Sequence, residues 1–447
     1  MTERNSSQAA RSVALHNAPS IGGLALLVGL TLASTALAQD VIELGVLAGT
    51  GFTPEAGNPA VAEAYQQAWD RFEAENPDIQ LRLEPHAGNT EALQDILTRG
   101  TAGRLPDVGI MDTFWIPRLH ASGYLQPMDH ILTEEDRADF LPGVIEATTH
   151  DGALRSIYIY NSWRGIFYRP SEVEALGYDA PPTDWDEFIA FGREAREAGY
   201  SYAVMLPANL SELTMLYMFP QILGLGGQIH DETGRPNFFE EPNRAIVERV
   251  YGMWRQLVEE GLMPANVGGM DETATRPFFY SGETITIGSS SSFINQFYFD
   301  VPPIRGDLGA TAVPLPDGAV PVPLLAAWGY TIFTEDPVRA EAASRFIRFM
   351  LSPEILSELN AVQGHLPVRR SIWENTPAFA DDPLFQQLYQ IQNDPRLQER
   401  SIFPIYPAIK DALTGQMAEV IAGNITPAEA VDRAGEEVMA AYERLAE

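Results

Sequence analysis

The chain has 447 residues, a net charge of −32 and no cysteine. Its length is ample for two lobes of ordinary size. The negative charge disfavours nucleic acids, anionic membranes and acidic polymers as partners, and the absence of cysteine excludes disulfides and thiolate chemistry. We interpret the acidity as an adaptation to salty surroundings, and an acidic face for a cationic ligand is the alternative.

The first 38 residues have the pattern of a cleavable export signal. Arg4 and Arg11 precede an apolar run, residues 21–33, which is too short for a comfortable membrane span. Residues 36–38, Ala-Leu-Ala, have the small-x-small form of a cleavage site. We therefore expect a mature periplasmic chain that begins at Gln39, with a retained membrane anchor as the alternative. A lipid anchor is excluded because no cysteine follows the apolar run.

The first elements of the mature chain alternate between strand and helix. The pattern predicts a strand over 41–47, an amphipathic helix over 60–76 and a strand over 79–83, an order that favours a parallel sheet. A buried strand is predicted over 108–111. In open sheets of this kind, ligands bind beyond the carboxyl ends of the strands. Polar and aromatic residues follow two of these strands, namely Thr50 and Phe52 after the first and Asp112 and Trp115 after the last.

Further elements follow in the second half of the chain. Asp184 is a predicted N-cap of a helix that runs to residue 198, so Trp185 beside it is expected to pack at the helix start. An apolar helix is predicted over 213–223. The run 324–333 predicts another strand, with Trp328 and Gly329 at a turn.

Several motifs resemble those of extracellular solute-binding proteins of the sugar-binding ABC-importer class. They occur in the family's order from Val41 to Leu445 and include PDVGIMDTFW at 106–115, GYLQPMD at 123–129, PPTDWDEF at 181–188 and GHLPV at 364–368. One departure is the bulky run Asn161–Arg164, which puts the particular ligand in doubt but not the fold.

The resemblance implies an α/β fold of the two-lobed periplasmic binding protein type. Each lobe would be a mainly parallel sheet flanked by helices, with a three-segment hinge between the lobes. The expected N-terminal lobe comprises residues 39–155 and 313–358, and the expected C-terminal lobe comprises 156–312 and 359–447, after the signal peptide 1–38.

Candidate ligand-binding residues lie at strand ends and lobe crossings. Sugars are held by aromatic rings against their C–H faces and by polar side chains that bond their hydroxyls. Alternatives remain open: Asp112 as a helix cap, Trp115 as a core residue, Trp163–Arg164 as a stacked structural pair, and Arg400 in a surface ion pair. The candidates are Thr50, Phe52, Asp112, Trp115, Trp163, Arg164, Tyr217, Ser290, Ser291, Trp328, Gly329 and Arg400.

The expected function is that of a monomeric, periplasmic substrate-binding component of an ABC importer, which captures a carbohydrate and delivers it to membrane permease subunits. Catalysis, a cofactor and a metal are not expected, because the seven histidines are scattered and no nucleophile elbow or P-loop occurs. A periplasmic carbohydrate-active enzyme and a receptor for a non-sugar solute such as a polyamine are the alternatives. Because of Arg164, an anionic sugar remains an alternative ligand, since a guanidinium binds a carboxylate well.

Overall fold

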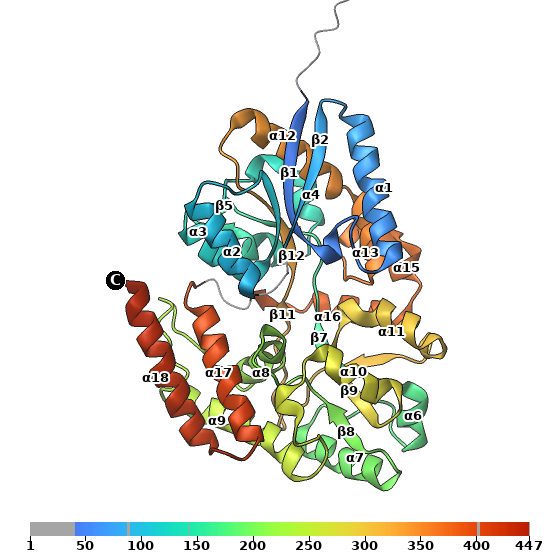
Figure 1. The fold of residues 1–447 in the computed structure, drawn as a ribbon. Helices are drawn as coiled ribbons and strands as arrows, with labels where there is room; N and C mark the ends of the chain where they lie inside the picture. The colour runs from blue at the N-terminus through green and yellow to red at the C-terminus, as the bar shows by residue number, and fades with distance from the viewer. Residues whose placement is uncertain (1–40, 87–89, 142, 400–402, 447) are drawn as a thin grey trace, which may run out of the picture. The chain divides into compact units, whose positions relative to one another are not determined.

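The computed structural model describes residues 41–86, 90–141, 143–399 and 403–446. These residues form two α/β lobes, each built on one main sheet. One main sheet lies in the upper half of Figure 1 and the other in the lower half. This arrangement confirms the two-lobed fold. The predicted signal peptide lies outside the described residues. None of the described helices is both long enough and apolar enough to cross a membrane.

The first sheet has five strands in the order β2-β1-β3-β12-β6. β1 is parallel to β2 and β3, and β12 is antiparallel to both β3 and β6, so β12 alone is reversed among these strands. The sheet is therefore mainly parallel, as predicted. Its strands are β1 (Ile42–Gly49), β2 (Ile79–His86), β3 (Val108–Asp112), β6 (Ile157–Tyr158) and β12 (Trp328–Ile332).

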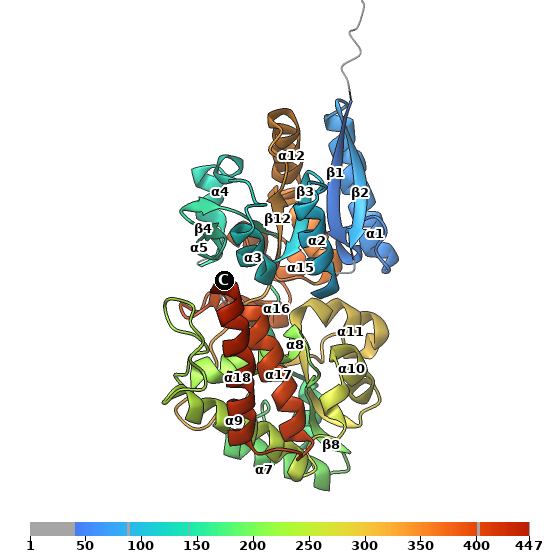
Figure 2. The same ribbon diagram turned by 60° about the vertical axis from the view of Figure 1, so that its left-hand side comes forward.

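Amphipathic helices cover the first sheet (Figures 1 and 2). The predicted apolar face of α1 is buried through Val61, Tyr65, Trp69 and Phe72. α12 packs on β1 and β12, and α13 packs on α1. The elements associated with this sheet are α1 (Pro59–Glu75), α2 (Thr90–Thr101), α3 (Ile116–Ala121), α4 (Glu134–Asp139), α5 (Val144–Ala147), the hairpin β4 (Thr149–His150) and β5 (Ala153–Leu154), α12 (Pro337–Met350) and α13 (Pro353–Gln363).

The second sheet has four strands in the order β10-β7-β9-β8. β8 and β9 are parallel, whereas β7 is antiparallel to both β9 and β10, so β7 is the reversed strand here. Each described main sheet thus carries one reversed strand. The strands are β7 (Arg164–Tyr168), β8 (Tyr202–Met205), β9 (Thr284–Ser290) and β10 (Gly309–Thr311).

Helices also flank the second sheet. The predicted cap is confirmed, because the Asp184 carboxylate accepts a hydrogen bond from the Glu187 N–H, and Trp185 is buried at the start of α7. α17 and α18 pack together against α9. The helices are α6 (Pro170–Ala175), α7 (Trp185–Glu197), α8 (Glu212–Gly224), α9 (Asn243–Glu259), α10 (Glu272–Tyr280), α11 (Ile294–Asp300), α17 (Tyr406–Ile421) and α18 (Pro427–Ala446).

Asn161 ties together the segments that connect the two sheets. Its N–H donates to the Leu366 carbonyl (2.8 Å), its Nδ2 donates to Gln392 Oε1 (2.6 Å), and its Oδ1 accepts from the Ala326 N–H (2.8 Å). Because Asn161 is fully buried, these bonds are shielded from water. Three chain segments that are distant in sequence therefore meet at one residue, through its side chain and its backbone N–H. The elements near this junction are α14 (Arg370–Asn375), α15 (Pro377–Ala380), α16 (Pro383–Gln392) and the pair β11 (Leu324–Leu325) and β13 (Gln398–Glu399).

The strand predicted over 324–333 is broken into β11 and β12. The interruption falls at Ala326 and Ala327, whose N–H groups donate to side chains, Asn161 Oδ1 at 2.8 Å and Thr113 Oγ1 at 3.4 Å, instead of to a neighbouring strand. The prediction of one continuous strand was wrong because side chains from other segments take the backbone donors there.

The lobe boundaries stay a prediction, and two contacts favour moving them. Ile157 and Tyr158 belong to the first sheet through β6, and Arg369 forms ion pairs with Asp136 and Asp139 near α4. We propose that the first crossing lies after residue 158 rather than at 155, and the third after residue 369 rather than at 358.

Candidate functional site

The two reversed strands begin where their neighbours end, and this brings four predicted residues to two strand edges. Trp328, the first residue of β12, pairs with Asp112, the last residue of β3. Arg164, the first residue of β7, pairs with Ser290, the last residue of β9. All four line one cavity of about 640 Å³. Such a volume is typical of a site for a small molecule.

An aromatic cluster backs the wall that the first sheet provides. The ring of Trp328 is partly exposed and lies stacked on His86, with 5.6 Å between the centroids and 11° between the planes. Phe52 and Trp115 contact the same indole at 5.1 and 5.4 Å. Trp115 is fully buried behind it and does not line the cavity. Trp328 therefore presents an aromatic face whose orientation is fixed by neighbouring rings.

Serine hydroxyls form the opposite wall, at the ends of β7 and β9. Ser162 Oγ and Ser290 Oγ are 2.6 Å apart, Ser292 Oγ donates to Ser162 Oγ (2.9 Å), and Arg164 Nη1 donates to Ser162 Oγ (3.0 Å). Ser291 lies behind this group and accepts a hydrogen bond from the Trp163 N–H. This wall offers several polar atoms at short spacing, as hydroxylated ligands require.

A buried ion pair fixes the arginine of that wall. Arg164 Nε lies 3.3 Å from Glu272 Oε1, and the two side chains are 11% and 1% exposed. Tyr217 donates its O–H to the same carboxylate oxygen (2.8 Å). Burial and the Glu272 charge hold the pKa of Tyr217 well above its ordinary value, so the phenol stays a donor. Tyr217 thus lies beneath the cavity wall rather than on it.

Three further predicted residues lie apart from the cavity lining. Thr50 is exposed in a short 3₁₀ turn, and Trp163 borders a smaller cavity of about 170 Å³. Gly329 lies inside the first sheet, where an added Cβ would come within 2.3 Å of Ser156 Oγ, so its small size serves packing. Arg400 falls outside the described residues.

Sequence reasoning missed several residues of the cavity. Tyr160 and Ser162 lie in the crossing segment, and Glu212 begins α8. Lys410 and Asp411 project from the first turns of α17 and form an ion pair with each other. One signal was available, because Lys410 is the only lysine in the chain.

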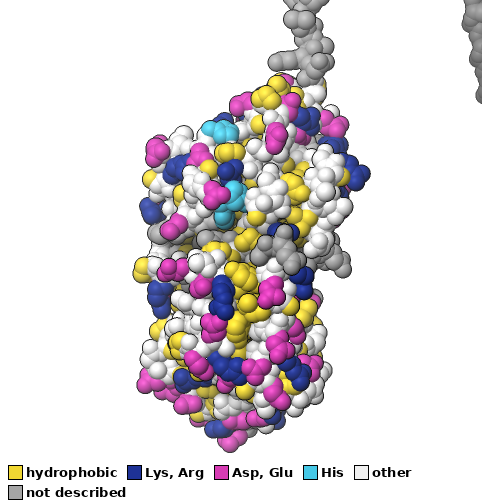
Figure 3. Space-filling model, turned by 90° about the vertical axis from the view of Figure 1, so that its left-hand side faces the viewer, with side chains coloured by type: hydrophobic (Ala, Val, Ile, Leu, Met, Phe, Trp, Pro, Cys, Tyr) yellow, Lys and Arg dark blue, Asp and Glu magenta, His cyan; other side chains and the backbone are white. Residues whose placement is uncertain are grey.

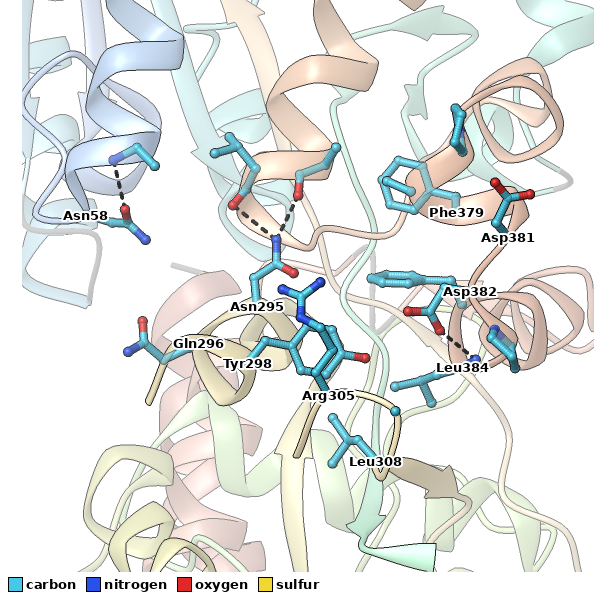
Figure 4. A pocket seen from close by; sticks show the side chains of 18 of the residues that line it. Asn58, Asn295, Gln296, Tyr298, Arg305, Leu308, Phe379, Asp381, Asp382 and Leu384 are labelled. Carbon is cyan, nitrogen blue, oxygen red and sulfur yellow. Dashed lines mark hydrogen bonds between the residues drawn. The ribbon is translucent and has the colours of Figure 1, made fainter. Parts of the chain in front are cut away.

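A larger groove of about 1210 Å³ lies away from these residues (Figure 4). Asn295 of α11 projects at its side and donates from Nδ2 to the carbonyls of Ala361 (2.7 Å) and Val362 (3.1 Å). Arg305 stacks on the ring of Tyr298 at 4.6 Å. None of the predicted site residues that the structure describes lines this groove. Across the described ranges, no group of three or more His, Asp or Glu side chains is arranged to hold a metal ion.

Acidic side chains do not gather in one patch on the face shown in Figure 3. They are scattered and interspersed with arginines, and hydrophobic side chains reach the surface in the middle of this view. The many acidic residues on this face therefore have the distribution of a solvated surface.

Comparison with known proteins places this geometry in a family. A family model described as bacterial extracellular solute-binding protein matches residues 56–355. A maltotriose-binding protein of Pyrococcus abyssi is 22% identical over 377 residues, which cover 81% of this chain and 75% of that protein. A Deinococcus radiodurans protein named "Probable ABC transporter-binding protein" is 20% identical over 332 residues, 73% of this chain and 77% of its own length.

A solved structure supports the fold. The sugar-binding protein MalE from Xanthomonas citri matches with a TM-score of 0.74 and 22% identity, over 90% of this chain and 98% of that one. The family match over most of the chain, together with the cavity between two α/β lobes, assigns the protein to a family. The chain belongs to the family of bacterial extracellular solute-binding proteins.

Proposed function

We propose that the protein is the exported, periplasmic receptor of an ABC importer and that it captures a carbohydrate in the cavity between its two lobes. The observation that carries this proposal is the composition of one cavity, in which the Trp328 indole and the Ser162–Ser290–Ser292 hydroxyls both line the wall. An aromatic face and clustered hydroxyls match the two sides of a sugar, its C–H face and its hydroxyl rim.

The receptor acts as a monomer and delivers its ligand to permease subunits in the membrane. Contacts from both lobes favour a closed form when ligand is present, since a ligand shifts the equilibrium toward the state that it binds better. The relatives named for maltotriose and for an ABC transporter support this role. Catalysis is no part of the proposal. Incubation with maltotriose should leave the trisaccharide intact in a chromatographic assay.

A polyamine receptor is the second candidate, and one observation favours it. Three carboxylates line the cavity, those of Asp112, Glu212 and Asp411. All three already have partners, because Asp112 accepts from the Phe114 N–H (3.2 Å), Glu212 accepts from the Tyr406 O–H (2.9 Å) and Asp411 pairs with Lys410. A cationic ligand would therefore have to compete with these contacts.

A thermal-shift panel tests the proposal. The purified exported chain is heated in high salt with maltose, maltotriose, neutral monosaccharides, glucuronate, glycosylated osmolytes and spermidine. A ligand that binds only the folded state raises Tm, by an amount that grows with ligand concentration above Kd. A rise with sugars supports the carbohydrate receptor, whereas a rise with spermidine alone contradicts it. The absence of a Tm rise with every member of the panel also contradicts it.

A matched pair of variants locates the binding site. Trp328→Ala removes the exposed indole and should abolish most of the Tm rise. Trp69→Phe is the control, because Trp69 packs on Phe346 in the first layer and does not line the cavity. An equal loss of the ligand-induced rise in both variants would argue against the cavity.

A further inference from the structure

Lys410 is unusual in this chain because it is a lysine. The sequence has 29 basic residues other than histidine, and Lys410 is the one lysine among them. Arginine and lysine are interchangeable on most solvated surfaces but differ in confined sites, since an ammonium is compact and a guanidinium is a broad planar fork. Lys410 is therefore the one position where the chain uses the compact cation in place of the planar fork.

The position of Lys410 agrees with that reasoning. Its side chain is 5% exposed and lines the cavity from the second turn of α17. A charged side chain that is so deeply buried must be paired, and the ammonium donates to Asp411 Oδ1. Asp411 itself is half exposed, so the pair lies across the cavity edge.

The ammonium has hydrogen-bonding capacity left over. An ammonium has three N–H donors, and among the residues that the structure describes only the Asp411 carboxylate accepts from it. Buried donors in native proteins almost always have partners. The remaining donors therefore require oxygen atoms that enter the cavity with a ligand or with water.

The charges around the cavity indicate which oxygen atoms these are. Both cations of the wall are already paired with carboxylates, Lys410 with Asp411 and Arg164 with Glu272. An anionic ligand would bring a further negative charge next to ion pairs whose charges are already balanced and would also meet Asp112 and Glu212 across the cavity. Uncharged hydroxyl and ether oxygens accept hydrogen bonds from the ammonium without disturbing either pair.

We propose that Lys410 is a ligand-contacting, specificity-determining residue that donates hydrogen bonds to oxygen atoms of an uncharged polyhydroxylated ligand. This proposal rests on the carbohydrate-receptor function. It goes beyond that function by naming a residue that contacts the ligand and by requiring that the ligand carry no charge.

The single lysine permits a direct test on the unmodified sequence. Lysine-selective ¹⁵N labelling of the side chain gives one Nζ resonance that needs no assignment, and it is recorded with maltose, maltotriose or glucuronate. A neutral sugar that raises Tm should also shift this resonance. Arg249→Lys is the control, because Arg249 is exposed on α9, and its added resonance should stay in place.

Two variants measure the contribution to binding. Lys410→Gln removes the charge and should raise Kd for that sugar by about 10- to 100-fold, as expected for a lost hydrogen bond to a charged group. Lys410→Arg keeps the charge and should raise Kd at least about tenfold, because the planar fork does not fit the confined position. Tm without ligand, measured on each variant, separates loss of binding from loss of folding.

The outcomes distinguish the two proposals. A sugar that raises Tm while the Lys410 resonance stays unchanged, or that binds Lys410→Arg as tightly as the parent, overturns the role of Lys410 and leaves the receptor function standing. If glucuronate is the only panel member that raises Tm and shifts the Lys410 resonance, the proposal of an uncharged ligand is wrong. No Tm rise with any sugar overturns the receptor function, and the Lys410 proposal with it.

Discussion

Replacing Glu272 by glutamine should destabilise the protein by about 3 kcal/mol. Removal of one partner from a buried ion pair typically costs ~3–5 kcal/mol, because the other charge stays buried without compensation. Arg164 and Glu272 are 11% and 1% exposed, so their pair meets that condition. We expect the lower end of the range, because Arg164 still donates to Ser162 Oγ and the glutamine oxygen still accepts from Tyr217.

Urea unfolding at pH 7 measures this loss as a change in the unfolding midpoint at constant m. Glu354→Gln is the matched control, because it removes an ion pair with Arg71 whose side chains are 70% and 39% exposed. Pairs that are exposed to solvent contribute little to stability, so this control should unfold near the midpoint of the parent. The double variant Arg164→Met with Glu272→Gln should regain part of the lost stability, since no unpaired charge remains. Equal losses for Glu272→Gln and Glu354→Gln would refute the buried-charge reasoning.

Three further changes have definite expected results. Burial lowers the pKa of His365 to about 3, so between pH 6.5 and 3 the unfolded chain binds a proton that the folded chain does not, and stability falls as the pH drops. His365→Phe should therefore reduce the stability lost between pH 7 and pH 5 by about 2 kcal/mol in urea titrations, and an unchanged loss would contradict this. Asn161→Ala leaves buried backbone and amide groups unpaired and should cost about 3 kcal/mol by the same method, whereas a cost below about 1 kcal/mol would show that the junction tolerates its absence. Gly329→Ala should cost about 1–3 kcal/mol because its Cβ meets Ser156 Oγ at 2.3 Å, while Gly51→Ala, with open space around it, should change the melting midpoint little.

Much of the fold could be predicted from periodicity and capping. The helix at Asp184, the apolar helix that contains Tyr217 and the strand that ends at Asp112 all lie where the sequence indicates them. These are local features, set by spacing and by the residues that begin and end each element. The direction of a strand in its sheet depends on distant partners instead. The reversal of β12 and β7, which brings Trp328 to Asp112 and Arg164 to Ser290, required the structure.

The candidate site could be predicted in part for the same reason. Strand ends and lobe crossings gave Asp112, Arg164, Ser290 and Trp328, which share the cavity. Trp115 follows a strand end too, but three aromatic neighbours cover its ring, and no sequence pattern reports such packing. Lys410 and Glu212 reach the cavity on helices from distant parts of the chain, and periodicity carries no information about that proximity.

The row of aromatic rings along the cavity wall has a consequence for how binding data are interpreted. From Trp328 it continues through Phe52 to Tyr160 and His365, which stack with 3.8 Å between their centroids. Tyr160 adjoins Asn161 at the junction of the crossing segments, so the surface proposed to receive a ligand and the joint between the lobes are parts of one packed body. A substitution at Trp328 therefore changes both the contact with a ligand and the stiffness of the joint. Its effect on association and dissociation rates, measured separately, says more about the molecule than its effect on Kd alone.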